Sequence, residues 1–474
     1  MNKKNIKLKL IILFSILFLS IFLNLQKSYS FLEKYDKYQV RSDGLEEHML
    51  IKSDIHSIWS AASRLLEDDK KGINYLKSGK EYSRTYLPSF IVYIYYKIIG
   101  EEIEEKNTDK SKIVSDVKFK IKNGKFGLLI FQNILFFLSM IFFYFYNRGI
   151  IKEKILLLSI FFICFEPTIS QWHSFFFTES VFISLLVIFL SLILNLKDNF
   201  YYIFILGILV GIIYLQKNLG FYLIIPAIII LFFKLKKKSI ILIPIMFMGY
   251  LIPILFLGIH NNVRSGEFYI LSKHMKIAPY HYIHHKLISA QYKIDTKKSL
   301  ELIKLNEKNW LEENKIDLNN ESDRLQFYKY KQKIFFKSAL ENPISLFKII
   351  IWKTLQSGVL DPNYTLKFTE IDKSVERYWA DKDYHKHLTL KVMYSLIIYL
   401  IVFLGLIKMF KLKEYYLLFT NLLLVLYLTL ILGWVGVSRY FIVNLIPISI
   451  IFSYGVFYLI DKFKNFKTSL DTRS

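Results

Sequence analysis

The sequence predicts an all-α polytopic membrane protein. We expect about ten transmembrane helices, interfacial helices in a large first outer loop, and a second large outer loop. Three observations lead to this fold class. Of the 474 residues, 53% are hydrophobic and 17% are aromatic, which is more than an ordinary soluble domain contains. Apolar runs recur from end to end, as in helical membrane proteins. Short clusters of lysine and arginine separate these runs, which is the positive-inside pattern.

The net charge of +24 would suggest a nucleic-acid partner if the chain were soluble. Here the basic residues lie between predicted membrane segments, and no soluble basic domain is separable in the sequence. We therefore expect a lipid bilayer as the surrounding medium and no nucleic-acid partner. The single cysteine, Cys164, lies in an apolar run. A disulfide within the chain and a cysteine-based zinc site are thus excluded.

The N-terminal segment 1–26 is predicted to be the first transmembrane helix. Four lysines precede the apolar run 11–23. A signal peptide is the alternative, because residues 28–30 resemble a cleavage site. We prefer an uncleaved span, since the rest of the chain is polytopic. Either interpretation places the following loop, 27–124, outside the cytoplasm.

The first outer loop is predicted to contain two helices that lie on the membrane. Apolar residues between Ile55 and Leu66 repeat with helical spacing, so 54–67 should be an amphipathic helix. Ser53 or Asp54 is well placed as its N-cap. The second helix, Leu87–Ile99, is shorter than the roughly 20 residues that a span needs and should lie in the interface.

The remaining chain divides into a transmembrane bundle (125–259), a second outer loop (260–391), C-terminal transmembrane helices (392–460) and a cytoplasmic tail (461–474). The second outer loop is predicted to contain one more surface helix, Pro343–Gln356, which is too short to cross the membrane. The further spans are predicted at 125–146, 155–171, 175–195, 201–216, 219–233, 239–259, 392–408, 415–433 and 438–460.

Acidic residues near span ends on the outer side are candidates for chemistry. Asp54 and Asp43 in the first outer loop are candidates for a general base that takes a proton from an acceptor hydroxyl. The alternative for each is a solvated loop acid or a helix N-cap. Glu179 and His173 flank the third and fourth spans in QWHSFFFTES. They are predicted to position a substrate, and they are weak candidates for metal ligands.

Three cations also fall on the outer side, where the positive-inside rule makes them unusual. Lys217, Arg264 and Arg439 are candidates for binding a donor phosphate. For Lys217 the alternative is a lysine that snorkels to the interface, and for Arg264 it is an ordinary boundary between span and loop. Acids and cations on one membrane face suit a lipid-linked phosphate substrate. A transporter would more naturally place charges near the membrane midplane.

The chain resembles the GT-C membrane glycosyltransferases, which include protein O-mannosyltransferases and lipid A aminoarabinose transferases. Six segments carry this resemblance, in order along the chain: SDIHSIWSAASRLL, RTYLPSFIVYIYYKIIG, FFTESVF, LQKNLGFYLIIP, HNNVRSGEFYILS and SRYFIVNLIP. The second has one proline where the family usually has two, and Lys217 replaces an arginine. The resemblance implies that an aspartate of the first outer loop is the catalytic base. Asp54 fits the helix motif better, whereas Asp43 lies closer to the first span, as the family's base usually does.

The predicted function is a glycosyltransferase of the inner (cytoplasmic) cell membrane. It would move a hexosyl or pentosyl group from a polyprenyl-phosphate carrier to an envelope acceptor, which is a lipid, glycan or protein. The sequence has no glycine-rich nucleotide-binding loop, which fits a lipid-linked donor. No cofactor is certain, and a divalent metal ion remains open. The alternative function is a lipid-linked sugar flippase or transporter that forms no bond.

Overall fold

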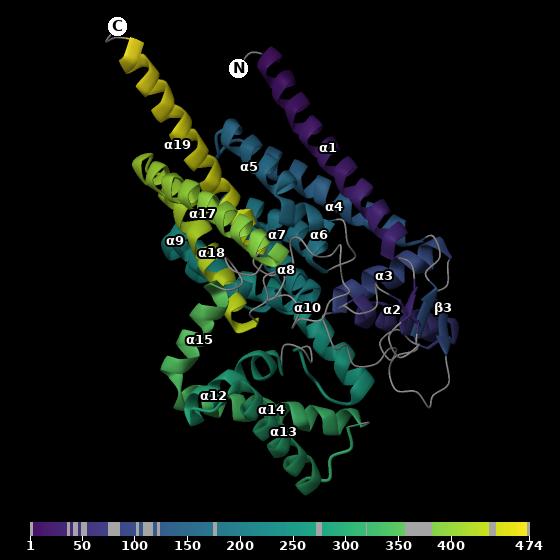
Figure 1. Ribbon diagram of the computed structural model, residues 1–474. Helices are drawn as coiled ribbons and strands as arrows, with labels where there is room; N and C mark the ends of the chain where they lie inside the picture. The colour runs from purple at the N-terminus through teal and green to yellow at the C-terminus, as the bar shows by residue number, and fades with distance from the viewer. Residues whose placement is uncertain are drawn as a thin grey trace.

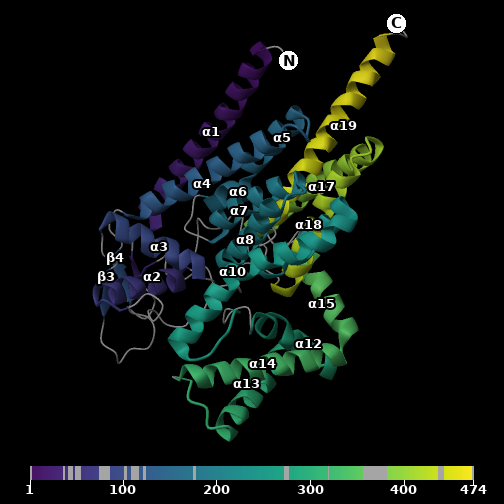
Figure 2. The same cartoon turned by 180° about the vertical axis from the view of Figure 1, so that it is seen from behind.

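The computed structural model describes residues 3–35, 38–40, 46–48, 55–73, 86–100, 104–107, 117–120, 124–173, 178–271, 277–318, 320–355, 382–435 and 442–471. Long helices form a bundle, and both ends of the chain lie at the same end of it (Figures 1 and 2). The bundle helices are α1 (Lys3–Tyr35), α4 (Gly124–Asn147), α5 (Glu153–Phe165), α6 (Pro167–His173), α7 (Thr178–Leu194), α8 (Phe200–Gln216), α9 (Ile224–Leu235), α10 (Ser239–Ser265), α17 (Lys382–Lys411), α18 (Tyr415–Val435) and α19 (Leu445–Asp471).

Two smaller groups of elements lie away from the chain ends (Figures 1 and 2). The first loop contributes α2 (Ile55–Lys70) and α3 (Tyr86–Ile99), close to their predicted bounds. The second loop folds into a body that we call the loop body. It contains the π-helix η5 (Tyr280–His284), α12 (His285–Tyr292), α13 (Thr296–Glu313) and α14 (Glu321–Glu341). From it α15 (Pro343–Leu355) leads back to the bundle.

The predicted helical membrane class is confirmed, and the first loop adds two small antiparallel ribbons. The strand β1 (Tyr38–Val40) pairs with β2 (Glu46–His48). Likewise β3 (Glu104–Asn107) pairs with β4 (Val117–Lys120). The sequence pattern did not predict these ribbons, because strands this short show too few alternating residues to recognise.

The predicted count of about ten spans stays a prediction. By length and composition, five stretches of the described chain could each cross a membrane, and one of them, Asn218–Arg264, is 47 residues long. That stretch contains a turn at η4 (Lys236–Lys238), where Lys236 has a φ of 51°, so α9 and α10 are separate helices. Shorter apolar helices, including α7 and α8, complete the bundle.

One predicted span is interrupted. The expected helix 155–171 is divided into α5 and α6 by Glu166 and Pro167. Proline disfavours the helical conformation for the residue before it, and Glu166 has φ −59° and ψ 123°. The Glu166 carboxylate then accepts a hydrogen bond of 2.8 Å from the backbone N–H of Ile169. This bond satisfies an otherwise open donor at the start of α6.

Close packing of small residues holds the C-terminal helices together. A Cβ atom at Gly405 of α17 would lie 1.9 Å from the carbonyl oxygen of Ile451, and one at Gly455 of α19 would lie 1.9 Å from that of Ile401. The two backbones therefore approach within a distance that only glycine allows. Such contacts are the usual way for membrane helices to associate, because lipid supplies no hydrophobic driving force between them.

Candidate functional site

A cavity of about 50 Å³ lies between the first-loop helices and the bundle. This volume is enough for water molecules. Its walls come from α2, α3, α4, α7 and α8. The lining residues are Ile58, Pro88, Ile91, Val92, Leu128, Phe131, Gln132, Thr178, Val181 and Gln216. The cavity is thus mostly apolar with a few polar groups, as is typical of ligand sites.

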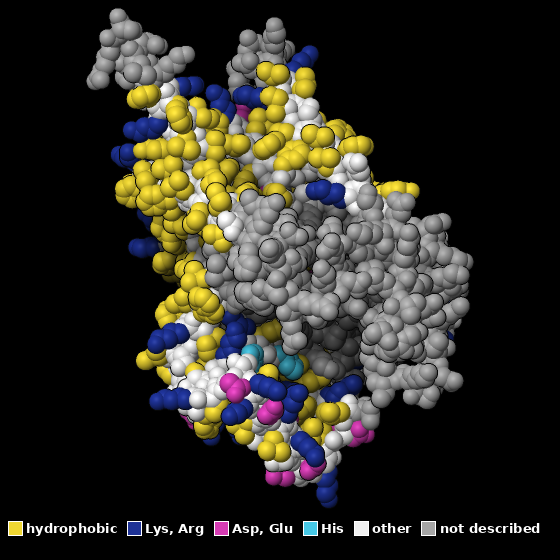
Figure 3. Space-filling view, viewed as in Figure 1, with side chains coloured by type: hydrophobic (Ala, Val, Ile, Leu, Met, Phe, Trp, Pro, Cys, Tyr) yellow, Lys and Arg dark blue, Asp and Glu magenta, His cyan; other side chains and the backbone are white. Residues whose placement is uncertain are grey.

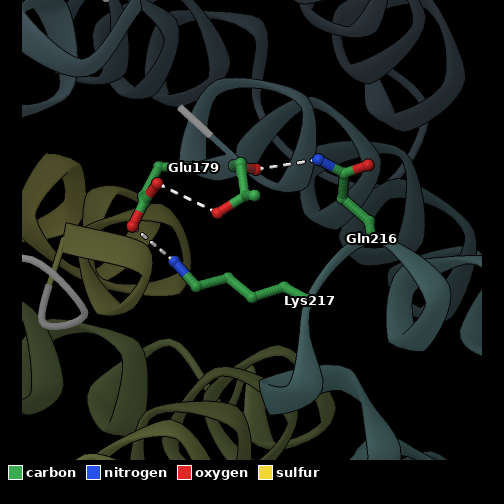
Figure 4. Close-up of polar contacts among 4 residues, drawn as sticks. Glu179, Gln216 and Lys217 are labelled. Carbon is green, nitrogen blue, oxygen red and sulfur yellow. Dashed lines mark hydrogen bonds and ion pairs between the residues drawn. The ribbon is translucent and has the colours of Figure 1, made fainter. Parts of the chain in front are cut away.

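A buried ion pair lies directly behind this wall. The Nζ atom of Lys217 is 2.7 Å from Oε1 of Glu179, and the two side chains are 8% and 2% exposed (Figure 4). Glu179 is in the first turn of α7, where the helix dipole favours a negative charge. Lys217 follows the last residue of α8 in an extended conformation, with φ −155° and ψ 134°. This turn at the end of α8 directs Lys217 toward α7.

The neighbours of the ion pair connect it to the cavity. The Thr178 hydroxyl donates to Oε2 of Glu179 at 3.1 Å. Nε2 of Gln216 donates to the Thr178 carbonyl at 3.0 Å (Figure 4). Thr178 and Gln216 both line the cavity, and each is followed in sequence by one member of the pair. The two charged residues are therefore the sequence neighbours of two residues that line the cavity.

His173 is close to this site but has other partners than Glu179. Its side chain is fully buried, and its Nδ1 lies 2.6 Å from the Ser180 hydroxyl. Its ring centroid is 3.8 Å from that of Phe136. The His173 carbonyl accepts a 2.9 Å hydrogen bond from Gln132, which lines the cavity. Within the described ranges Nε2 of His173 is buried without a hydrogen-bond partner.

Arg264 lies in the last turn of α10, a helix that also contacts α3. Its guanidinium donates to the Tyr269 hydroxyl, and the neighbouring Asn261 donates to the Tyr269 carbonyl at 2.7 Å. His260 on the same helix meets Tyr86 of α3 edge to face, with ring centroids 5.3 Å apart. Helix α3 thus contacts α10, which carries Arg264, and lines the same cavity as the residues next to Glu179 and Lys217.

Three predicted site residues, Asp54, Asp43 and Arg439, lie outside the described residues. Asp54 directly precedes Ile55, the first residue of α2. Ile58, one helical turn further on, lines the cavity. The predicted divalent metal also stays untested. In the part of the chain that the structure describes, no three histidine, cysteine, aspartate or glutamate side chains form a cluster that could hold a metal ion.

Sequence reasoning missed two polar residues of the cavity wall, Gln132 and Thr178. Gln132 and Asn133 are adjacent amides inside an apolar run, and both donate to the His173 carbonyl. Polar side chains within a span are rare and usually have a purpose, so the pair of amides was a usable signal. Thr178 gives no such signal, because its role depends on where α8 packs.

Residues 116–259 match the family described as dolichyl-phosphate-mannose-protein mannosyltransferase. The match covers α4 to α9 and most of α10, and includes Glu179 and Lys217. The resemblance to the GT-C membrane glycosyltransferases is confirmed by this match. Three of the predicted site residues, Asp43, Asp54 and Arg264, lie beyond the matched residues.

Among solved structures, the chain is similar to an oligosaccharyltransferase from Archaeoglobus fulgidus, tethered to an acceptor peptide that contains the NVT sequon. The TM-score is 0.48 and the sequence identity is 12%. The match covers 95% of this chain and 50% of the oligosaccharyltransferase, so the chain spans about half the length of that protein. No curated protein matches the chain significantly.

Proposed function

We propose that this chain is a membrane glycosyltransferase of the GT-C type that moves a sugar from a polyprenyl-phosphate carrier to an envelope acceptor. The reaction would take place at the outer face of the cytoplasmic membrane. One observation carries the proposal. The buried pair of Glu179 and Lys217 lies behind a cavity that α2 and α3 form with the bundle, and the pair is inside the segment that matches the mannosyltransferase family.

Asp54 is the proposed general base. It precedes α2, whose Ile58 lines the cavity, and a carboxylate there would face an acceptor hydroxyl. The Asp54 carboxylate would take the hydroxyl proton while the acceptor oxygen bonds to the anomeric carbon of the sugar. The bond from that carbon to the phosphate oxygen breaks, and polyprenyl phosphate leaves with the electron pair. The configuration at the anomeric carbon is inverted. Asp43 is the second candidate for this role.

Lys217 is the proposed partner of the donor phosphate on the bundle side. Its ammonium group has three N–H donors, and Glu179 accepts one of them. A buried ammonium group is costly without a counter-ion, so Glu179 would keep Lys217 charged and hold it behind the cavity wall. As the phosphate leaves, its developing charge would be stabilised by this ammonium group.

Arg264 and Arg439 are the further proposed ligands of the donor phosphate, since a guanidinium matches a phosphate well. Arg264 is at the end of α10 beside α3. Glu179 would also position the sugar. His173 would support this site indirectly, through Ser180 of α7 and through the amides of α4. A divalent metal remains an option for the site and is not required by the roles above.

Asparagine substitutions in the first loop test this function. The purified full chain, reconstituted in liposomes with a polyprenyl-phosphate sugar, is assayed for free polyprenyl phosphate and glycosylated acceptor. We expect Asp54→Asn to lower the transfer rate about 10²- to 10⁴-fold, the usual contribution of a positioned base. Glu67→Gln, an exposed acid of α2, is the control and should retain the rate.

Two results would contradict the proposal. Full activity in both Asp54→Asn and Asp43→Asn would remove the carboxylate mechanism. Movement of the donor across the bilayer with no glycosylated product would favour the flippase alternative.

A further inference from the structure

The α15 helix exposes an apolar stripe that no other part of the described chain covers. The side chains of Ile344 and Phe347 are 70% and 62% exposed. The stripe continues along the helix at the spacing of one helical face. Its remaining members are Ile351, Trp352 and Leu355. A tryptophan in such a stripe is typical of a segment at a membrane interface.

The position of α15 indicates what covers this stripe. The helix packs against α18 of the bundle, and both ribbon views place it between the loop body and the bundle (Figures 1 and 2). On the space-filling surface, the hydrophobic side chains of the bundle extend down to the level of α15, where lysines begin (Figure 3). The helix that carries the apolar stripe therefore lies next to the apolar surface of the bundle.

The length of α15 agrees with this position. Its 13 residues span about 20 Å at 1.5 Å per residue. The hydrocarbon core of a bilayer is about 30 Å thick. The helix is too short to cross the core and long enough to enter one leaflet.

Basic side chains gather where α15 meets the loop body. Lys353 is 5% exposed and donates to the Tyr282 carbonyl at 2.6 Å. Tyr282, His285 and Lys286 are three and four residues apart on continuous helix, so they share a face. Lys353 is directed at that face. We call Lys353, Lys286 and His285 the basic cluster.

The basic cluster has no carboxylate of its own within the described ranges. Glu307 of the same body is paired with Lys331 at 2.9 Å, and neither Lys286 nor Lys353 forms an ion pair among the residues described. Burial and the charge of Lys286 lower the pKa of Lys353 to about 8. Burial lowers the pKa of His285 as well, with both lysines adding to the effect. An anion at this place would relieve the repulsion.

We propose that α15 inserts its apolar stripe into the adjacent membrane leaflet and that the basic cluster binds the phosphate of an anionic phospholipid there. Lys286 and His285 are half-buried and would contact the phosphate, with Lys353 adding its charge from behind. The acyl chains would lie along the stripe, beside α18. This lipid site is independent of the proposed transfer reaction.

Insertion of α15 is tested by spin labelling of the full chain in liposomes. Cys164 is the one cysteine of the sequence and is buried, so Cys164→Ser provides a background for Phe347→Cys. Glu312→Cys, on an exposed position of α13, is the control label. At 347 we expect collisions with oxygen to exceed those with a polar nickel complex, and at 312 we expect the reverse. Equal nickel access at both positions would overturn the insertion.

The phosphate site is tested by titrating phosphatidylglycerol into the protein in neutral mixed micelles and following the thermal unfolding midpoint. Lys286→Gln should raise the apparent Kd for phosphatidylglycerol about fivefold, the usual effect of one basic residue at a lipid surface. Lys304→Gln removes the same charge from an exposed position of α13 and should leave the Kd unchanged. Equal Kd values for wild type and Lys286→Gln would overturn the site, as would stabilisation by polyprenyl phosphate in place of phosphatidylglycerol.

Discussion

Lys217 and Lys353 are two of the buried lysines that the structure describes, and they differ in how their charge is compensated. Lys217 of the bundle has its own carboxylate, Glu179, at 2.7 Å. Lys353 of α15 donates to a backbone carbonyl of the loop body and lies beside a second lysine. The first arrangement fixes a charge in one position behind a cavity. The second brings two lysines together where α15 meets the loop body, with no ion pair to either of them among the residues described. The comparison teaches that a carboxylate partner holds a buried cation in one place, whereas a cation without such a partner is the one for which we propose a lipid phosphate.

The largest expected effect comes from breaking the ion pair between Glu179 and Lys217. Lys217→Met should lower the free energy of unfolding by about 3–5 kcal/mol, because it leaves the Glu179 carboxylate buried without its partner. The double variant Glu179→Gln, Lys217→Met removes both charges and should recover most of that loss. Thermal unfolding of the purified protein in detergent measures both.

The sugar-transfer rate of the double variant then shows whether the ion pair is needed for the reaction or only for stability. If the double variant regains stability but transfers no sugar, the charge itself is needed for the reaction. A double variant with the wild-type transfer rate would show that the pair serves only to hold α7 against α8.

A second, smaller effect is expected where α17 and α19 of the bundle pack closely against each other. Gly455→Ala would place a Cβ atom 1.9 Å from the Ile401 carbonyl and should lower the free energy of unfolding by about 1–3 kcal/mol, as overpacked cores do. Gly149→Ala is the matched control, because a Cβ atom there meets no atom within 4 Å. Unfolding midpoints measure the difference. Equal midpoints in the two variants would mean that α17 and α19 separate without cost.

The smallest expected effect is confined to the cavity. Val181→Leu adds one methylene group to the cavity wall and should lower kcat/KM for transfer about tenfold, the low end for one methylene in a binding pocket. Val187→Leu adds the same group to the same helix at a fully buried position outside the cavity wall. It should change stability and leave KM unchanged. Steady-state kinetics measure both variants. An equal change of KM in Val181→Leu and Val187→Leu would disprove a substrate role for the cavity.

Several elements could be predicted from the sequence because their signals are local. The amphipathic repeat after Asp54 predicted a helix over 54–67, and α2 runs from Ile55 to Lys70. The short apolar run near Pro88 predicted α3 within one residue, and α15 was predicted equally closely. The break at Glu166 was missed although two signals were present: proline disfavours a helical conformation in the residue before it, and the segment after Pro167, TISQWH, is mostly polar.

The candidate site was predicted only in part. Glu179, Lys217 and Arg264 were recognised because charged groups at the ends of spans are unusual. Their partners could not be recognised. Glu179 and Lys217 are 38 residues apart in sequence, and hydropathy does not specify which ends of α7 and α8 face one another. His173 was predicted to position a substrate together with Glu179; its ring contacts Ser180, and its role stays a prediction.

By itself, the sequence determined which segments are apolar, how long they are and where charge collects between them, because these properties depend only on residue type and spacing. These properties were enough to predict a helical membrane protein, its surface helices and its resemblance to GT-C glycosyltransferases. The tertiary structure alone decided that Glu179 pairs with Lys217, that α2 and α3 close a cavity over them, and that Lys353 meets the face of Lys286. Such contacts depend on how the helices pack, and packing geometry follows from the combined shapes of side chains far apart in the chain.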